Sequence, residues 1–292
     1  MTGPVALMRS KLFVPASRPE LFAKAAASAA DALSFDLEDA VVAARKDSAR
    51  ATLASYLGQM AHRQLVVVRI NGLHTRWCEE DIRAIAATQT DIINIPMTET
   101  PETVIAVAAL LERFEQPANQ GRIRLLVNIE TPKALLNAAA LASAHPRVMG
   151  LQIGYADLLE PCGIDRTNLA ALDHVRLTVR FAAATAGVAV YDGAYFDVAD
   201  PSGCQAESMA ARRAGYAGKS CIHPSQIAIV NAAFSPTQAE IDRARRILAA
   251  AEDAMAAGTG AFTVDGVMID APFLPRARAM IDWAAQQEQH HD

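Results

Sequence analysis

Two carboxylates stand out because each comes where an apolar segment ends. Glu130 follows the apolar run at 125–129, and Asp157 comes shortly after a second run at 148–153. Short, strongly apolar runs of this kind are typical of buried strands. Oxygen ligands from two strand ends would suit a hard divalent cation whose other octahedral positions hold water or substrate oxygens. The alternative is that Glu130 caps the following helix and Asp157 is an ordinary loop carboxylate.

Such a site requires the two strands to be neighbours. Pro132 opens a helix predicted over residues 132–144, which would join the strands in one right-handed βαβ unit. Parallel neighbours leave a sheet at the same edge, so both carboxylates would face one cleft.

Arg69 is the third residue that could take part in chemistry. It follows three valines in "VVVRIN", where a cation must face a cleft or be neutralised by a carboxylate. Facing the cleft, its guanidinium could hold a carboxylate or an enolate oxygen through two parallel hydrogen bonds, which is the interpretation we favour. The alternative is an internal salt bridge to Asp36 or Glu38. The acidic run at 36–39 could itself be an outer shell of the metal site or a helix-start cluster.

The pattern along the chain predicts the elements that position these residues. Strands are expected at 11–14, 32–37, 65–70, 92–95, 125–129, 148–153, 188–191 and 218–222. Helices are expected at 19–30, 45–57, 79–87, 101–114, 132–144, 176–186 and 202–214. This alternation predicts a (β/α)8 TIM barrel, with an open doubly wound sheet as the alternative. The nucleotide-binding versions of an open sheet are unsupported, because neither GxGxxG nor GxxxxGK[ST] is present.

In a parallel barrel, chemistry takes place at the carboxyl ends of the strands, where polar residues recur in this chain. His223 follows the eighth strand and precedes a proline. That setting is more typical of a hydrogen-bonded loop residue than of a base.

A C-terminal extension at 236–292 follows the barrel domain at 1–235. It is expected to contain a helix at 236–257 with Ser235 as its N-cap, a hairpin turning at Asp265-Gly266, and a helix at 272–286. Its small size predicts no core of its own and packing on the barrel or on an adjacent subunit. His290 and His291 are expected to form a frayed terminus rather than a metal site.

Composition excludes several other classes. The 292 residues carry a net charge of -5, so no basic field favours nucleic acid or a membrane surface. The four cysteines form no CxxC pair, which signals neither a zinc site nor a disulfide framework. No apolar run is long enough to cross a bilayer, and the first residues lack the apolar region of a signal peptide. We expect a cytoplasmic protein with reduced thiols.

The sequence resembles the citrate lyase β-subunit-like (CitE-like) acyl-CoA lyases of the HpcH/HpaI aldolase superfamily. The resemblance rests on "RSKLFVPASRPELFAKAAASAADALSFDLEDAV", "VVVRINGL", "VNIETPKAL", "LQIGYADL", "VYDGAYFDVAD", "GYAGKSCIHPSQI" and "FTVDGVMIDAPFLPRA". These segments span nearly the whole chain in family order. They imply a (β/α)8 barrel that assembles as a homotrimer or hexamer.

The resemblance also implies roles for individual residues. Glu130 and Asp157 would ligate Mg2+, and Arg69 would bind the substrate carboxylate or the oxygen on which negative charge develops. An acidic residue of the "DGVMID" segment would reach the active site of the adjacent subunit as a catalytic group. Asp270 is the better match for it, and Asp265 the weaker one.

The implied reaction is cleavage of a carbon–carbon bond in a 3-hydroxyacyl-CoA thioester that bears a carboxylate. We favour (S)-citramalyl-CoA, giving acetyl-CoA and pyruvate, and malyl-CoA and citryl-CoA remain open. Arg18 would contact the CoA phosphates. The alternatives are an acyl-CoA thioester hydrolase on the same scaffold, and a carrier-protein-dependent citryl lyase subunit without activity on free CoA esters.

Two departures from the family pattern bear on the substrate. Ile95-Pro96-Met97 stands where many relatives carry Leu-Pro-Lys, and Ala16-Ser17 stands where many have a glycine after "FVP". Loss of a cation at Met97 changes what the pocket can hold. An apolar side chain there would suit a methyl group better than another carboxylate.

Overall fold

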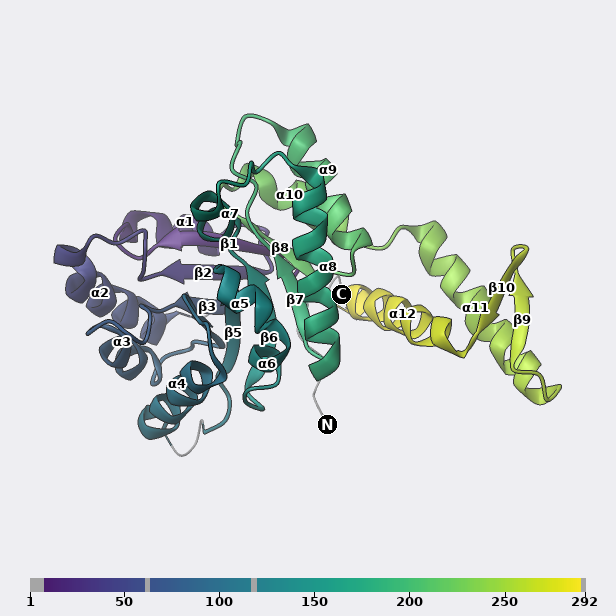
Figure 1. The fold of residues 1–292 in the computed structure, drawn as a ribbon, viewed down its shortest axis with the longest axis horizontal. Helices are drawn as coiled ribbons and strands as arrows, with labels where there is room; N and C mark the ends of the chain where they lie inside the picture. Colours follow the sequence, from purple (N-terminus) through teal and green to yellow (C-terminus); the bar gives the residue numbers. More distant parts are fainter. Residues whose placement is uncertain (1–7, 61–63, 117–119, 290–292) are drawn as a thin grey trace. The chain divides into compact units, whose positions relative to one another are not determined.

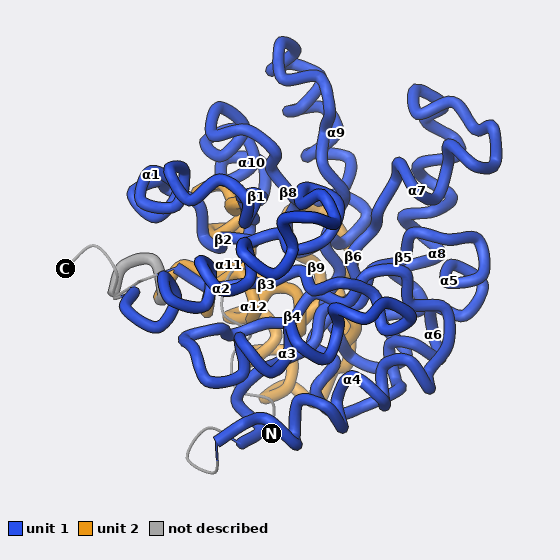
Figure 2. The backbone as a smooth tube through the Cα atoms, turned by 90° about the vertical axis from the view of Figure 1, so that its left-hand side faces the viewer, with its two compact units in different colours: residues 1–234 blue, residues 235–292 orange. Residues whose placement is uncertain are grey.

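The computed structural model describes residues 8–60, 64–116 and 120–289, with side chains described as far as residue 285. The chain divides into two compact units, residues 1–234 and residues 235–292, which Figure 2 draws in different colours. His290 and His291 lie outside the described residues. No helix among the described residues is long and apolar enough to span a membrane.

Eight parallel strands close into a barrel in the first unit, which confirms the predicted TIM-barrel fold (Figure 1). The strands are β1 Ser10–Pro15, β2 Ala32–Asp36, β3 Leu65–Arg69, β4 Ile92–Ile95, β5 Arg124–Ile129, β6 Val148–Ile153, β7 Ala189–Asp192 and β8 Gly218–Cys221. Closure occurs where β1 pairs with β8, Lys11 lying opposite Ser220. The barrel brings the carboxyl ends of all eight strands to one rim.

Helices surround the barrel. They are α1 Phe22–Ala26, α2 Lys46–Gln59, α3 Cys78–Ile85, α4 Pro101–Phe114, α5 Pro132–Leu136, α6 Ala138–Ala142, α7 Tyr155–Leu159, α8 Leu169–Ala186, α9 Pro201–Arg213 and α10 Ser225–Phe234, with short 3-10 turns η1 Pro19–Leu21, η2 Ala43–Arg45 and η4 Glu160–Cys162. Alternate strand residues, such as Leu33 and Phe35, join the main apolar cluster between strands and helices. The residues between them face the barrel interior, as the two-residue period of a strand requires.

The helices differ from the sequence prediction in five main places. Helix α8, expected at 176–186, begins at Leu169. The helix expected at 19–30 is a 3-10 turn followed by a helix that ends at Ala26. The helix expected at 132–144 is interrupted at Asn137, whose φ of -97° and ψ of 6° leave the helical region. Helices α7 and α10 were not predicted. Helix α7 has only five residues, and α10 is apolar on most of its faces, so neither shows amphipathic periodicity.

The second unit contains α11 Gln238–Ala256, a hairpin of β9 Ala261–Val264 and β10 Val267–Asp270, η5 Ala271–Phe273 and α12 Leu274–Gln289. The hairpin prediction is confirmed, with positive φ at both turn residues, Asp265 and Gly266. The predicted N-cap at Ser235 is wrong. Thr237 caps α11 in a capping box with Glu240, although Ser235, which has Gln238 three residues further on, also matches the capping-box pattern.

The expectation that the extension holds no core of its own is also wrong. Ala244, Ile247, Val264, Ile269 and Ala277 form a small buried apolar cluster within this unit. Two helices and a hairpin therefore bury apolar residues against one another, despite their short length. Packing of this unit on the barrel or on an adjacent subunit stays a prediction.

Barrel closure should depend on the absence of a side chain at Gly218. A Cβ there would overlap the backbone carbonyl oxygens of Met8 and Arg9, at the junction of β8 with β1. We expect Gly218→Ala to lower the free energy of unfolding by roughly 1–3 kcal/mol, the usual cost of overpacking. Urea denaturation measures the change. In the matched control Gly58→Ala, the new Cβ meets nothing within 4 Å, so equal loss in both variants would contradict this account.

Candidate active site

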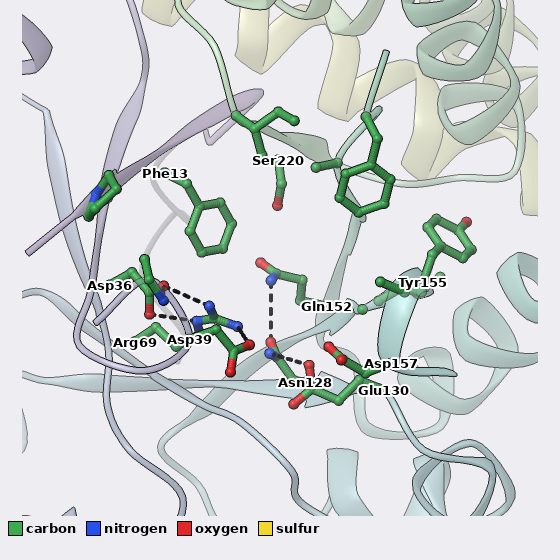
Figure 3. A pocket seen from close by; sticks show the side chains of 18 residues that line it. Phe13, Asp36, Asp39, Arg69, Asn128, Glu130, Gln152, Tyr155, Asp157 and Ser220 are labelled. Carbon is green, nitrogen blue, oxygen red and sulfur yellow. Dashed lines mark hydrogen bonds and ion pairs between the residues drawn. The ribbon is translucent and has the colours of Figure 1, made fainter. Parts of the chain in front are cut away.

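A cavity of about 500 Å3 lies at the carboxyl-terminal rim of the barrel (Figure 3). Residues of β1, β2, β3, β5, β6 and β8, and of the loops that follow strands, line it. It brings together Arg69, Glu130 and Asp157, three of the residues identified from the sequence. This is the location expected for the chemistry of a parallel barrel.

Glu130 directly follows β5 and is almost completely buried. Its Oε1 accepts a hydrogen bond of 2.5 Å from the Met97 backbone N–H, and its Oε2 accepts one of 2.9 Å from Asn128 Nδ2. Burial raises the pKa of Glu130 despite these bonds, and the nearby charge of Asp157 adds to the rise. The suggestion that Glu130 caps the next helix is wrong. Thr131 does so, its hydroxyl accepting from the Ala134 N–H at 3.1 Å.

Asp157 lies in the first turn of α7, not in a loop as the alternative supposed. Figure 3 shows its carboxyl group beside that of Glu130 at one side of the cavity. Burial raises the pKa of Asp157, and the charge of Asp39 contributes to the rise. Two carboxylates with raised pKa values in one cavity are an arrangement that a bound cation would stabilise.

Gly154 allows this close approach. It precedes α7, and a Cβ at its position would stand 2.6 Å from Glu130 Oε2 and 2.7 Å from Glu130 Cβ. The backbone that leads to Asp157 therefore packs directly against the Glu130 side chain.

Arg69 is paired within the protein. Its Nε and Nη2 donate to the two carboxylate oxygens of Asp36 at 2.8 and 2.7 Å, and its Nη1 lies 2.8 Å from Glu38 and 3.3 Å from Asp39. Burial would lower the pKa of Arg69, but the hydrogen bonds and charge of Asp36 outweigh it and raise the pKa. The salt bridge considered as the alternative is thus present. Direct binding of a ligand oxygen by Arg69 stays a prediction.

The acidic run at 36–39 therefore serves chiefly to hold this arginine. Asp36 also accepts from the backbone N–H groups of Glu38 and Ala40, at 2.9 and 3.0 Å, which fixes the turn after β2. Burial raises the pKa of Glu38 to about 8, with added repulsion from Asp39 and Glu130. Carboxylates outnumber cations around the cavity, which favours binding of a divalent cation there.

The donor set suits Mg2+. Among the residues that the structure describes, no group of three or more His, Cys, Asp or Glu side chains is arranged to hold a metal. Two carboxylates meet instead, and Mg2+ commonly binds through one or two carboxylates while keeping several waters for substrate to replace. Glu130 and Asp157 fit this requirement, whereas a zinc site would call for nitrogen or sulfur ligands.

A polar chain that the sequence analysis missed lies in the barrel interior. Lys11 Nζ donates to Gln152 Oε1, and Gln152 Nε2 donates to Asn128 Oδ1 at 3.3 Å. Asn128 in turn donates to Glu130, so the chain ends on a candidate metal ligand. Burial holds the pKa of Lys11 well below its ordinary value, with help from the charge of Arg69. Polar residues at inward positions of apolar strands were the available signal.

A second buried network supports α7. The Tyr155 hydroxyl donates to Asp192 Oδ1 at 2.7 Å, and Lys219 Nζ donates to Asp192 Oδ2 at 2.8 Å. Arg176 Nη2 lies 3.3 Å from the same carboxylate. Burial would raise the pKa of Asp192, but the charges of Lys219 and Arg176 outweigh it and lower the pKa. Tyr155, two residues before Asp157, is thereby anchored to the end of β7.

Met97 has an unusual backbone. Its φ of 46° lies in the left-handed region, which residues with a Cβ adopt infrequently and at a cost. This conformation accompanies the hydrogen bond from the Met97 N–H to Glu130. The Met97 side chain is 43% exposed and lies outside the cavity lining.

Two other candidates of the first unit, Arg18 and His223, are not among the residues that line the cavity. Arg18 is exposed and pairs with Glu20 at 2.8 Å. His223 Nδ1 hydrogen-bonds Ser225 Oγ at 2.8 Å, which confirms it as a hydrogen-bonded loop residue. In the second unit, Asp270 ends β10 and is half-buried, whereas Asp265 pairs with Arg246 at 2.8 Å.

Gly154→Ala should weaken metal binding, because the added methyl must displace Glu130. We expect at least a tenfold loss of Mn2+ affinity, measured by the electron paramagnetic resonance signal of free Mn2+. Gly58→Ala is the matched control and should bind Mn2+ as the wild type does. Equal affinity in all three proteins would contradict the placement of Glu130 as a ligand.

The raised pKa of Glu38 predicts a pH-dependent stability. An unfolded glutamate loses its proton near its ordinary pKa, but folded Glu38 keeps it until about pH 8. The unfolded chain therefore binds fewer protons in this window, and stability falls as pH rises from about 5 to 8. We expect the free energy of unfolding of the metal-free protein to fall between about pH 5 and pH 8, and Glu38→Gln to reduce this fall by at least about 1 kcal/mol. Denaturation curves recorded at several pH values in this window measure it. Parallel curves for variant and wild type would contradict it.

Comparisons with known proteins agree with this geometry. Residues 9–224 match the family model described as HpcH/HpaI aldolase/citrate lyase. The chain is 32% identical to the citrate lyase subunit beta of Escherichia coli strain K12 over 280 residues, 94% of this chain and 93% of that protein. It is 37% identical over 272 residues to a (3S)-malyl-CoA thioesterase of Cereibacter sphaeroides, 92% of each chain.

A solved structure extends the comparison. The Mycobacterium tuberculosis protein CitE, in complex with magnesium, acetoacetate and coenzyme A, is 34% identical, with a TM-score of 0.76 over 96% of this chain and 99% of that one. The family model, the curated relatives and this structure all cover most of the chain. The chain therefore belongs to the HpcH/HpaI aldolase/citrate lyase family and is a citrate lyase β-like lyase.

Proposed function

We propose that this enzyme is a Mg2+-dependent carbon–carbon lyase that cleaves a carboxylate-bearing 3-hydroxyacyl-CoA thioester. The observation that carries the proposal is the meeting of Glu130 and Asp157 in one cavity beside Arg69. A solved relative supports it, because the Mycobacterium tuberculosis protein CitE was obtained in complex with magnesium, acetoacetate and coenzyme A. (S)-Citramalyl-CoA is the favoured substrate, with acetyl-CoA and pyruvate as products.

Glu130 and Asp157 would hold the ion, and the hydroxy-acid end of the substrate would complete its coordination. Bound Mg2+ acts as a Lewis acid towards the hydroxyl and carboxylate oxygens that bind it. Arg69, kept charged and fixed by Asp36, places positive charge at the cavity wall, where it would stabilise negative charge that develops on oxygen. The backbone N–H of Met97 keeps Glu130 oriented.

The reaction needs a base and an acid. The substrate hydroxyl loses its proton, the bond to the neighbouring methylene carbon breaks, and the hydroxyl carbon becomes the carbonyl of a 2-oxo acid. The electron pair of the broken bond passes to the thioester as an enolate, which gains a proton at carbon to give the acetyl thioester. Asp270 of an adjacent subunit, in a homotrimer or hexamer, is our candidate for the acid-base residue.

The preference for (S)-citramalyl-CoA rests on the family resemblance. The apolar Met97, which stands where many relatives carry a lysine, adds no support from the structure, because its side chain is exposed and lies outside the cavity lining. One methyl group discriminates by only about 1–3 kcal/mol, so malyl-CoA and citryl-CoA remain alternatives. Arg18 remains the proposed contact for the CoA phosphates, and the cytoplasm the proposed compartment.

Thioester hydrolysis is a second candidate, favoured by the 37% identity to a (3S)-malyl-CoA thioesterase. In that reaction water attacks the thioester carbonyl, and the products are free CoA and the intact hydroxy acid. A carrier-protein-dependent citryl lyase subunit is a further candidate, because citrate lyase beta subunits are also among the relatives. Such a subunit would not act on free CoA esters.

Product analysis tests the proposal. With (S)-citramalyl-CoA and Mg2+, we expect pyruvate release, followed with lactate dehydrogenase, which EDTA abolishes and Glu130→Ala lowers by at least about 100-fold. Asp270→Asn should lose turnover, whereas the matched Asp265→Asn should keep it. Free CoA and intact hydroxy acid, without any 2-oxo acid from the three esters, would establish the hydrolase instead. Full turnover by Asp270→Asn would remove its proposed role.

A further inference from the structure

Ser220 places a free hydroxyl inside the active-site cavity. It lies on β8, is only 2% exposed, and lines the cavity. Its Oγ makes no hydrogen bond with any residue that the structure describes. Figure 3 shows the hydroxyl pointing into the cavity between Phe13 and Gln152. Buried hydroxyls in folded proteins normally have a partner, so this one is suited to a ligand atom.

The surroundings of Ser220 indicate which part of a ligand it meets. The charged lining residues belong to the part of the rim from β2 to α7, and they are Asp36, Asp39, Arg69, Glu130 and Asp157. The part formed by β8, β1 and the loop after β7 is lined by apolar residues, namely Phe13, Ala194, Phe196 and Ile222, together with the Ser220 hydroxyl. The cavity thus has a charged half and an apolar half that contains one free hydroxyl.

We propose that Ser220 donates a hydrogen bond to the thioester carbonyl oxygen of the substrate. The inference rests on the proposed function, in which the hydroxy-acid end lies at Glu130 and Asp157. The acyl thioester then extends into the apolar half, and its carbonyl oxygen is the polar atom that needs a partner there. Tyr155, which also lines the cavity, already donates its hydroxyl hydrogen to Asp192.

This contact would act on the bond-breaking step. As the carbon–carbon bond breaks, its electron pair moves into the thioester and leaves negative charge on the carbonyl oxygen. The hydroxyl proton of the substrate leaves to the base, and the enolate later gains a proton at carbon, so Ser220 itself neither gains nor loses a proton. A hydrogen bond to an oxygen that becomes charged strengthens in the transition state. Ser220 should therefore affect kcat more than KM.

The first arm of the test is kinetic. We expect Ser220→Ala to lower kcat for (S)-citramalyl-CoA about 100-fold with KM changed only a few-fold, as for loss of one oxyanion donor. Ser220→Thr keeps the hydroxyl and should recover most of the loss. Ser34→Ala is the matched control, because Ser34 is equally buried, has no hydrogen-bond partner among the described residues and does not line the cavity. It should turn over as the wild type does.

The second arm measures binding of two probes by calorimetry, acetyl-CoA and its thioether analogue S-ethyl-coenzyme A, which lacks the carbonyl oxygen. The wild type should bind acetyl-CoA about 3–10-fold more tightly than the thioether, the value of one hydrogen bond, and Ser220→Ala should lose this preference. Wild-type turnover and an unchanged preference in Ser220→Ala would overturn the inference. If the preference for acetyl-CoA depends on Ser220 but the enzyme releases no 2-oxo acid from its substrate, the contact would be supported and the proposed lyase reaction overturned. Wild-type protein that binds neither probe would overturn both.

Discussion

The site depends on the compensation of buried negative charge. Asp36, Glu38, Glu130 and Asp157 gather around a cavity in which burial alone would keep such groups neutral. Arg69 is the cation in their midst, and its bidentate contact with Asp36 lowers the pKa of that carboxyl although burial would raise it. Arg69 does not pair with Glu130 or Asp157, so negative charge on these two carboxylates is left uncompensated. A divalent cation would supply the balance, which connects the packing of the barrel with its proposed chemistry.

The barrel makes this arrangement through strand register. Asp36 and Arg69 are register partners on β2 and β3, so their side chains leave the sheet side by side. Ile129 and Ile153 are likewise partners at the ends of β5 and β6, which brings Glu130 next to the segment that begins at Gly154. The charged residues lie at the ends of rigid strands or within a few residues of them, so the barrel determines their positions. Such positioning is what a preorganised site requires.

Much of this architecture could be predicted from the sequence. The strands end where apolar runs meet proline or charge, and the expected bounds of β4 and β6 are those observed. The convergence of Glu130 and Asp157 followed from the parallel pairing of two strands joined by one helix. The partner of Arg69 could not be chosen, because that choice depends on the register between two strands. The N-cap of α11 could not be chosen from the sequence, because Ser235 with Gln238 and Thr237 with Glu240 both match the capping-box pattern.

Other features depend on three-dimensional packing alone. The left-handed backbone of Met97 has no local sequence signal. Lys11 and Gln152 are visible in the sequence as polar residues within apolar strands, but their contact with each other depends on strands that lie far apart in the chain. The same holds for the free hydroxyl of Ser220.

The central claim is that a metal binds between the carboxylates of Glu130 and Asp157. Anomalous diffraction from crystals of the protein soaked in Mn2+ tests it most directly. The account predicts one strong peak within about 2.0–2.3 Å of a carboxylate oxygen from each residue, and loss of that peak in Glu130→Ala crystals. A peak at another place, or occupancy of this place that persists without Glu130, would contradict the account.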